Sequence, residues 1–195
     1  MSKKSKTSLV IATAICAGCL IFGLGDSWAK EKVRKPIQER FEATISPVFV
    51  STPNSRLAIA IEEFTSDQEL QDLAQTFLSR GKRALEDAMG KFKKGHLDVP
   101  GGEGMPIEIL ESEGAGAVRN LTILAERGLN NRWGVSQQLA ADYPYIFVQL
   151  EVNEQGNGKG TLIRFAKLAF NPQGRMVIEN WGRQRFQLIN VHLVK

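Results

Sequence analysis

The chain has 195 residues, a formal net charge of +4, and only two cysteines and two histidines. Residues 1–29 hold both cysteines, three of the 25 lysines and arginines and one of the 21 acids, so the remainder carries 22 basic and 20 acidic side chains. This near-neutral remainder gives no electrostatic case for nucleic-acid binding, and without cysteine it has no disulfide, thiolate metal site or cysteine nucleophile.

The first segment has the three parts of an export signal. Basic residues come first, an apolar run follows over residues 9–24, and the small residues Ser27 and Ala29 flank Trp28. Small side chains at these two positions fit a signal peptidase cleft. We therefore expect residues 1–29 to be a signal peptide that is cleaved after Ala29, and the protein to be periplasmic or secreted.

Two other fates of this segment are open. An apolar run of this length is near the lower limit for crossing a bilayer, so an uncleaved anchor is one alternative. The run Cys16-Ala17-Gly18-Cys19 looks like a lipobox, which would place a lipid on Cys19. Cys16 stands where lipoboxes usually carry leucine, and Leu20 follows in place of a polar tether. In either case the N-terminal segment would keep the protein anchored to the membrane.

The next residues predict a polar leader and two strands. Residues 30–40 are polar and interrupted by Pro36, which is more typical of a solvated leader than of a basic patch on lipid. Residues 41–50 are rich in β-branched and aromatic side chains, with Pro47 suggesting an edge or a bulge. Alternating apolar residues predict a second strand over residues 56–63.

A helical pair is expected next. Ser66 and Glu69 have the spacing of a capping box, in which the two side chains satisfy each other's backbone amides at the start of a helix. Apolar residues then recur at helical spacing up to Gly81, which favours a stop. A second amphipathic run follows, with Gly95 as its stop. We place the pair within residues 66–94 and expect its aromatic and methionine side chains in the core.

The remainder predicts short strands separated by turns. The expected strands cover residues 96–99, 107–112, 117–125, 146–152, 161–170, 175–181 and 185–194. Residues 156–160 and 171–174 supply turns between the last strands. We expect one α+β domain over residues 41–195, predominantly antiparallel β, built as a sandwich or barrel with the helical pair packed on it.

Five runs of the sequence form a recognisable pattern: IEEFTSDQELQDLA, GKRALEDAM, DYPYIFVQLEVNEQGNGKGTLIRFAKLAF, NPQGRMVIENWG and LINV. The most specific pieces are TSDQEL and GNGKGTLI. Together, over residues 41–194, they resemble a family of uncharacterised exported bacterial proteins. The resemblance implies export and a single domain. It implies no activity, substrate or catalytic residue.

Motifs for cofactor and metal chemistry are few. Gly156, Gly158 and Gly160 would suit a phosphate loop only between a strand and a helix. A strand is expected on both sides, so a hairpin turn is the better interpretation. The two histidines, His96 and His192, have no helix-spaced partner, and a zinc site would need both together with distant carboxylates. We expect neither a cofactor nor a metal.

Hydrolytic chemistry has weak support in the sequence. No G-x-S-x-G motif is present, and Ser136 lacks the glycine two residues on. Glutamates are grouped at residues 62–63, 108–113 and 151–154, but glycosidase chemistry needs two carboxylates held across a cleft. On strands such side chains usually form the solvated face, and we expect this here.

One segment, residues 127–145, has the composition of an interaction surface. Arg132, Trp133, Tyr143 and Tyr145 are crowded there without clear periodicity, and these residue types dominate contact energetics. We take these four as candidate binding residues. The alternative is a long loop whose aromatic side chains cover the end of a sheet.

The sequence contains no convergent set of nucleophile, base or metal ligands. This favours a non-enzymatic binding or structural module of the bacterial envelope, whose partner would be an envelope protein, a glycan or a lipid. The alternative is an envelope hydrolase that acts on a glycan or lipid through carboxylates on the sheet.

Cleavage after Ala29 is tested by the intact mass of the protein recovered from membrane and soluble fractions of an expressing bacterium. We expect a soluble product that begins at Lys30, because the small-x-small site ends there. A diacylated Cys19, or a membrane-bound chain that retains residues 1–29, would contradict this prediction.

Overall fold

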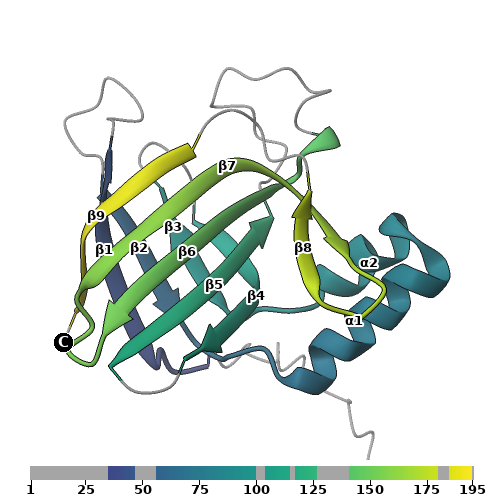
Figure 1. Ribbon diagram of the computed structural model, residues 1–195, viewed down its shortest axis with the longest axis horizontal. Coiled ribbons are helices and arrows are strands. Elements are labelled where there is room, and N and C mark those ends of the chain that lie inside the picture. Colours follow the sequence, from purple (N-terminus) through teal and green to yellow (C-terminus); the bar gives the residue numbers. More distant parts are fainter. Residues whose placement is uncertain are drawn as a thin grey trace, which may run out of the picture. The chain divides into compact units, whose positions relative to one another are not determined.

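The computed structural model describes residues 35–46, 56–99, 104–114, 117–126, 141–179 and 185–194. Within these residues the chain forms nine strands and two helices (Figure 1). The strands are β1 (Glu39–Ser46), β2 (Arg56–Ile61), β3 (Gly95–Asp98), β4 (Met105–Glu113), β5 (Val118–Glu126), β6 (Tyr145–Asn153), β7 (Gly158–Phe170), β8 (Met176–Glu179) and β9 (Arg185–Leu193). The helices are α1 (Asp67–Arg80) and α2 (Lys82–Met89).

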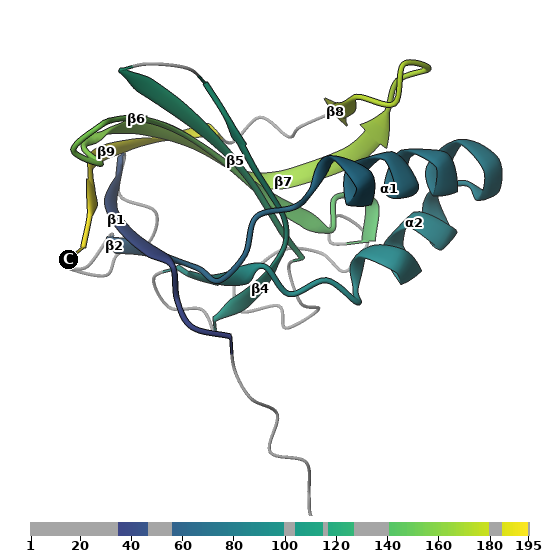
Figure 2. The same cartoon turned by 90° about the horizontal axis from the view of Figure 1, so that it is seen from below.

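Eight of the strands close into an antiparallel barrel. Neighbouring strands pair in the order β6-β5-β4-β3-β2-β1-β9-β7, and β7 pairs with β6 to complete the ring. β8 extends the sheet by pairing with the far end of β7, residues 167–170. Seen from below, the ring lies on one side and the helices lie beside it (Figure 2). The expected fold class, α+β with a predominantly antiparallel sheet and a packed helical pair, is confirmed in its barrel form.

Apolar side chains fill the inside of the barrel. Successive side chains of a strand point to opposite faces, so every second residue faces inward. The inward residues of β5 and β6 have no more than about one hundredth of their surface exposed. They are Leu121, Ile123, Ala125, Ile146, Val148, Leu150 and Val152. The four β6 residues of this set recur at every second position of the sequence, which is the pattern of a strand with one buried face.

The outer faces of β5, β6 and β7 change character along the strands. Near the helices the outward side chains are apolar and buried, as at Leu124 and Ile163. Farther along the same strands the outward positions are polar and more exposed, as at Asn120, Gln149 and Thr161. One half of this outer face is therefore available for packing, and the other half faces solvent.

The helical pair covers the apolar half. α1 contributes Leu73 and Ala74, and α2 contributes Leu85 and Met89, each of them at most 4% exposed. They form one cluster with outward residues of β4 to β7, and Phe170 at the end of β7 joins it. We call this cluster the helix-facing core. It is separate from the barrel interior, so the domain has two apolar cores, one on each side of the same strands.

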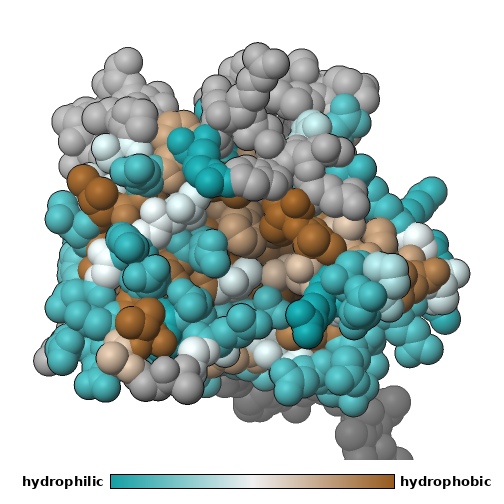
Figure 3. Space-filling model, in the orientation of Figure 1, coloured by the Kyte–Doolittle hydropathy of each residue, from teal (hydrophilic) through white to brown (hydrophobic). Residues whose placement is uncertain are grey.

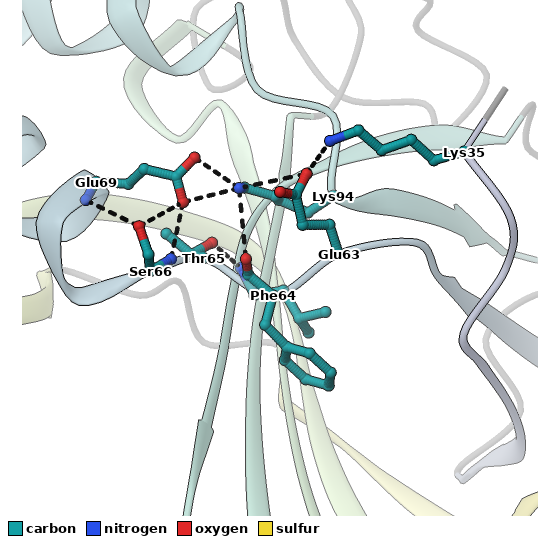
Figure 4. Close-up of polar contacts among 8 residues, drawn as sticks. Lys35, Glu63, Phe64, Thr65, Ser66, Glu69 and Lys94 are labelled. Atoms are coloured by element: carbon teal, nitrogen blue, oxygen red, sulfur yellow. Dashed lines mark hydrogen bonds and ion pairs between the residues drawn. The ribbon is translucent and has the colours of Figure 1, made fainter. Parts of the chain in front are cut away.

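A buried lysine ties the start of α1 to the barrel (Figure 4). Lys94, just before β3, is 2% exposed, and its Nζ lies 2.7 Å and 2.8 Å from the two carboxylate oxygens of Glu69 in the first turn of α1. The same nitrogen donates to the carbonyl oxygen of Phe64 at 3.4 Å. Glu69 in turn accepts from the backbone amide of Ser66 at 2.8 Å, which completes the predicted capping box.

The carboxylate of Glu69 is stabilised by these contacts. Burial alone would raise the pKa of Glu69, but the hydrogen bonds from Lys94 and Ser66 outweigh it and hold the pKa below its usual value. The ionised form is thus the one that the network selects. Glu69 serves at once as helix cap and as counter-ion of a buried ammonium group.

Two hydrogen bonds between Thr65 and the backbone of Leu110 add to this junction. The Thr65 amide donates to the Leu110 carbonyl at 2.8 Å, and the Leu110 amide donates to Thr65 Oγ1 at 2.9 Å. Because Leu110 lies in the middle of β4, the segment before α1 is fixed against the centre of a barrel strand. The direction in which α1 leaves the barrel is therefore set by β3 and β4 together.

Most strand ends differ from the sequence-based expectation by one to four residues, and three boundaries involve residues for which the sequence predicts another role. α2 ends at Met89, and Gly95, the expected stop, is instead the first residue of β3 with a φ of 152°. A Cβ at this position would lie 2.0 Å from the Ala60 carbonyl oxygen, so the glycine serves the close approach of β2 and β3. β7 begins at Gly158, inside the expected turn, and β1 begins at Glu39, inside the expected leader. Among the described residues, no helix is long and apolar enough to span a membrane.

The Lys94 network predicts an unequal response to two adjacent substitutions. Lys94→Met leaves the Glu69 carboxylate without its main partner, and breaking a buried pair from one side costs about 3 kcal/mol of unfolding free energy. Lys93→Met, at the exposed neighbouring lysine, should change stability by less than about 0.5 kcal/mol. Urea unfolding of the two variants measures both values, and equal values would show that the buried ion pair does not hold α1.

Candidate functional site

The four residues that sequence reasoning selected do not share one environment. Arg132 and Trp133 lie outside the described residues, and Tyr143 is half-buried just before β6. Tyr145 is 3% exposed in the helix-facing core, and its hydroxyl lies 3.8 Å from the sulfur of Met89. A binding role for this segment stays a prediction, and the position of Tyr145 shows a side chain that packs against α2.

The two histidine side chains are exposed on different strands, and each has an acidic neighbour of its own. His96 Nδ1 lies 3.6 Å from Glu62 Oε1, and His192 Nε2 lies 3.6 Å from Glu42 Oε2. The other ring nitrogen of His192 is 2.9 Å from the Asn190 carbonyl oxygen. Within the residues described above, no three His, Cys, Asp or Glu side chains come together in a way that could hold a metal ion.

One of the grouped glutamates is buried, contrary to the expectation of a solvated face. Glu108 is 3% exposed, although it lies on β4 between Ile107 and Ile109. Ile107 pairs with Ala125 and Ile109 pairs with Leu124, so Glu108 is the extra residue of a β-bulge. At the bulge the side chains of β4 no longer alternate regularly between the two faces of the sheet. This is why the period of the sequence predicted the environment of Glu108 wrongly.

The carboxyl group of Glu108 has only acidic groups among the charges that shift its pKa. Burial, followed by the neighbouring carboxyl groups of Glu126 and Glu86, raises the pKa of Glu108 to about 8. Glu108 Oε2 has no hydrogen-bond partner, and Glu126 is linked to Glu108 by a side-chain hydrogen bond. With its pKa raised in this way, Glu108 keeps its proton at neutral pH.

Tyr145 belongs to the same acidic environment. Burial raises the pKa of Tyr145 well above its usual value, and nearby carboxyl groups, Glu108 first among them, add to the rise. Glu126 pairs directly with Tyr145 across β5 and β6. The cluster thus lies at the junction of β4, β5, β6 and α2, and at neutral pH its buried members are uncharged.

A second feature lies on the polar half of the barrel's outer face. It is a shallow groove of about 420 Å³ across β5, β6, β7 and β9. We call it the outer-face groove. It is lined by Asn120, Gln149, Glu151, Lys159, Gly160, Thr161, Gln187, Leu188 and Ile189. In Figure 1 these strands face the reader, and Figure 3 shows mainly hydrophilic side chains over the lower left of this face, with hydrophobic ones set among them.

The register of the strands arranges the lining side chains in two rows. Thr161 pairs with Gln149 on one side and with Gln187 on the other, which forms the first row. Glu151 pairs with Asn120 and with Lys159, which forms the second row. The rows are two residues apart along the strands, or roughly 7 Å. The residues between them face inward, so the groove runs across the strands.

A glycine and a bulge shape the space between the rows. Gly160 pairs with both Leu150 and Leu188, and a Cβ there would lie 2.5 Å from the Gln149 carbonyl oxygen. In β9 the register shifts at Asn190, whose φ is 52°, and Ile189 beside it is 41% exposed. The tight approach of β6, β7 and β9 at Gly160 leaves their backbones as the floor of the groove.

The sequence held part of the signal for this groove. Alternation in β6 predicts that Gln149 and Glu151 face away from the core. Gly158 and Gly160 in β7 indicate a close approach of a neighbouring strand. The partners Asn120 and Gln187 are distant in the sequence, and only the pairing of β5 with β6 and of β7 with β9 brings them into the rows. Single-strand patterns do not carry that information.

Comparisons with known proteins add no assignment: no protein-family model, curated protein or solved structure matches the chain.

The buried carboxyl of Glu108 predicts a pH-dependent stability. Its pKa rises from 4.5 to about 8 on folding. Its stabilising contribution is therefore complete below pH 4.5 and is lost as pH rises toward 8, because only the unfolded chain ionises in that window. The full loss is up to about 5 kcal/mol. Glu108→Gln keeps the shape and removes the ionisation, so its stability relative to wild type should increase between pH 5 and pH 9.

Urea unfolding at pH 5, 7 and 9 measures this difference. Glu113→Gln is the matched control, since Glu113 is exposed on the same strand, and it should follow the wild type at every pH. If Glu108→Gln also ran parallel to the wild type, the carboxyl group would be ionised in the folded protein.

Proposed function

We propose that the chain is an exported, non-enzymatic binding module, which acts in the periplasm or after secretion and binds its partner in the outer-face groove. The observation that supports this proposal is the double row of polar side chains across four strands. The rows present amide groups, a hydroxyl group and one pair of opposite charges, and such polar groups orient a ligand. They are held on the wall of a closed barrel, which keeps their spacing fixed.

The chemistry of the groove favours binding over catalysis. Glu151 lies 3.5 Å from Lys159, and among the described residues that line the groove these two are the only ionisable side chains. Hydrolysis of a glycan by carboxylates needs two of them facing the substrate, and the described lining of the groove has one. The remaining lining groups, amides and a threonine hydroxyl, act as hydrogen-bonding groups. The export address rests on the N-terminal sequence and stays a proposal with its alternative, retention by an uncleaved or lipidated N-terminus.

The second candidate function is an envelope hydrolase, and the Glu108 and Glu126 pair favours it. Two hydrogen-bonded carboxyls with one raised pKa are what acid and base chemistry at neutral pH requires. Against this role, Glu108 is 3% exposed in a junction packed against α2. With so little exposed surface, the Glu108 carboxyl group is closed to a substrate in this structure. We therefore place binding first.

The two functions are separated by one incubation with purified bacterial cell-wall glycan and, in parallel, with phospholipid vesicles. Co-sedimentation measures binding, and mass spectrometry of the supernatant measures released products. We expect the wild-type protein to sediment with one of the two materials and to release no product. The double variant Gln149→Ala/Gln187→Ala should sediment about tenfold less, because one row loses its two amides.

The matched control carries Gln71→Ala and Gln75→Ala on the exposed face of α1, and it should sediment like the wild type. Thermal unfolding checks that both double variants are folded. Product release that disappears in Glu108→Gln or Glu126→Gln would overturn the module proposal in favour of the hydrolase.

A further inference from the structure

We infer that the ligand of the outer-face groove is a neutral carbohydrate chain lying across the strands. The inference rests on the proposed binding function and names the class of ligand. Three properties of the groove lead to it: its charge balance, its hydrogen-bonding groups and the closed backbone of its floor.

The groove carries no net charge. Glu151 and Lys159 are cross-strand partners, and their charged groups lie 3.5 Å apart. The other polar lining side chains are neutral. Phosphate groups and polyanions are recognised by concentrated positive charge, which this groove does not offer. A ligand without charge therefore fits it best.

The hydrogen-bonding groups match hydroxyls. Each amide side chain offers two donors and an accepting oxygen, and a threonine hydroxyl both donates and accepts. A sugar hydroxyl likewise donates and accepts, so neighbouring hydroxyls can satisfy both functions of one amide. Gln149, Thr161 and Gln187 stand side by side in one row, with Asn120 in the other. A polyhydroxylated chain lying between the rows would contact both along its length.

The closed backbone argues against an extended peptide. Peptides bind sheets most readily by pairing with an exposed strand edge. Gly160 in the floor is already paired with Leu150 on β6 and with Leu188 on β9. No edge is free at this position of β7, so a peptide would have to bind through side chains alone.

The lining also argues against an acyl chain. An acyl chain offers no hydrogen-bond partner to the amide and hydroxyl groups of the two rows, which would lose their water when it bound. Of the apolar lining residues, Leu188 is fully buried and Ile189 is 41% exposed. One exposed aliphatic side chain beside polar rows suits the C–H face of a sugar ring better than a lipid tail.

Titration calorimetry with defined probes tests the inference. The probes are cellohexaose, maltohexaose and chitohexaose as neutral oligosaccharides, a neutral ten-residue peptide, and phosphatidylcholine vesicles. We expect at least one oligosaccharide to bind and its affinity to fall about tenfold or more in Gln149→Ala/Gln187→Ala. Thr161→Arg, which adds bulk and charge in the middle of the first row, should abolish binding. The α1 control Gln71→Ala/Gln75→Ala should bind as the wild type does.

The outcomes separate this inference from the proposed function. If the peptide or the vesicles bind, and the groove variants remove that binding, the carbohydrate assignment is wrong and the binding module stands. If no probe binds and the protein sediments with neither cell-wall glycan nor vesicles, both are wrong. If an oligosaccharide binds equally to the wild type and the groove variants, the ligand class is right but its placement in the groove is wrong, and the inference fails.

Discussion

The ion pair between Lys94 and Glu69 is the constraint on which the two-core architecture depends. Because the barrel sheet is closed, it has no free edge strand that could orient the helical pair. A separate contact must therefore fix the position of the helices. Lys94 Nζ supplies this contact by joining the first turn of α1 to the chain just before β3. Its positive charge is buried, and an isolated buried charge is costly. Its partners Glu69, the Phe64 carbonyl oxygen and Glu63, which lies 3.8 Å away, stabilise the arrangement.

Once the helices are fixed, they divide the outer face of the barrel. The apolar outward residues of β5 to β7, such as Leu124 and Ile163, lie under the helical pair, and the polar ones, such as Gln149 and Thr161, remain outside. The same strands thus contribute to a core on one half of their outer face and to a groove on the other. Along each strand the outward side chains change from apolar to polar. This one change explains both why the helices cover one half of the outer face and why the groove lies on the other.

Sequence patterns predicted what is local and regular. Alternation found the inward face of β6, and the spacing of Ser66 and Glu69 found the start of α1, since both signals lie within one element. The bulge at Glu108 could not be found in this way, because a bulge exists only relative to the partner strand. The same is true of the partner of Lys94 and of the rows of the groove, which depend on contacts between segments distant in the sequence. The spacing of Gln149 and Gln187 does not indicate that both flank Thr161.

Two buried ionisable groups show opposite solutions to the same physical problem. Lys94 lies against the Glu69 carboxylate and the Phe64 carbonyl oxygen, which compensate its buried ammonium group. Glu108 meets acidic neighbours and loses its charge by keeping a proton. The first group fastens α1 to the barrel through an ion pair, whereas the second lies near Glu86 of α2 and has a pKa raised to about 8. Because the pKa of Glu69 lies below its usual value, its carboxylate is ionised in the neutral range. The proton held by Glu108, near Tyr145 of the helix-facing core, lies away from the groove.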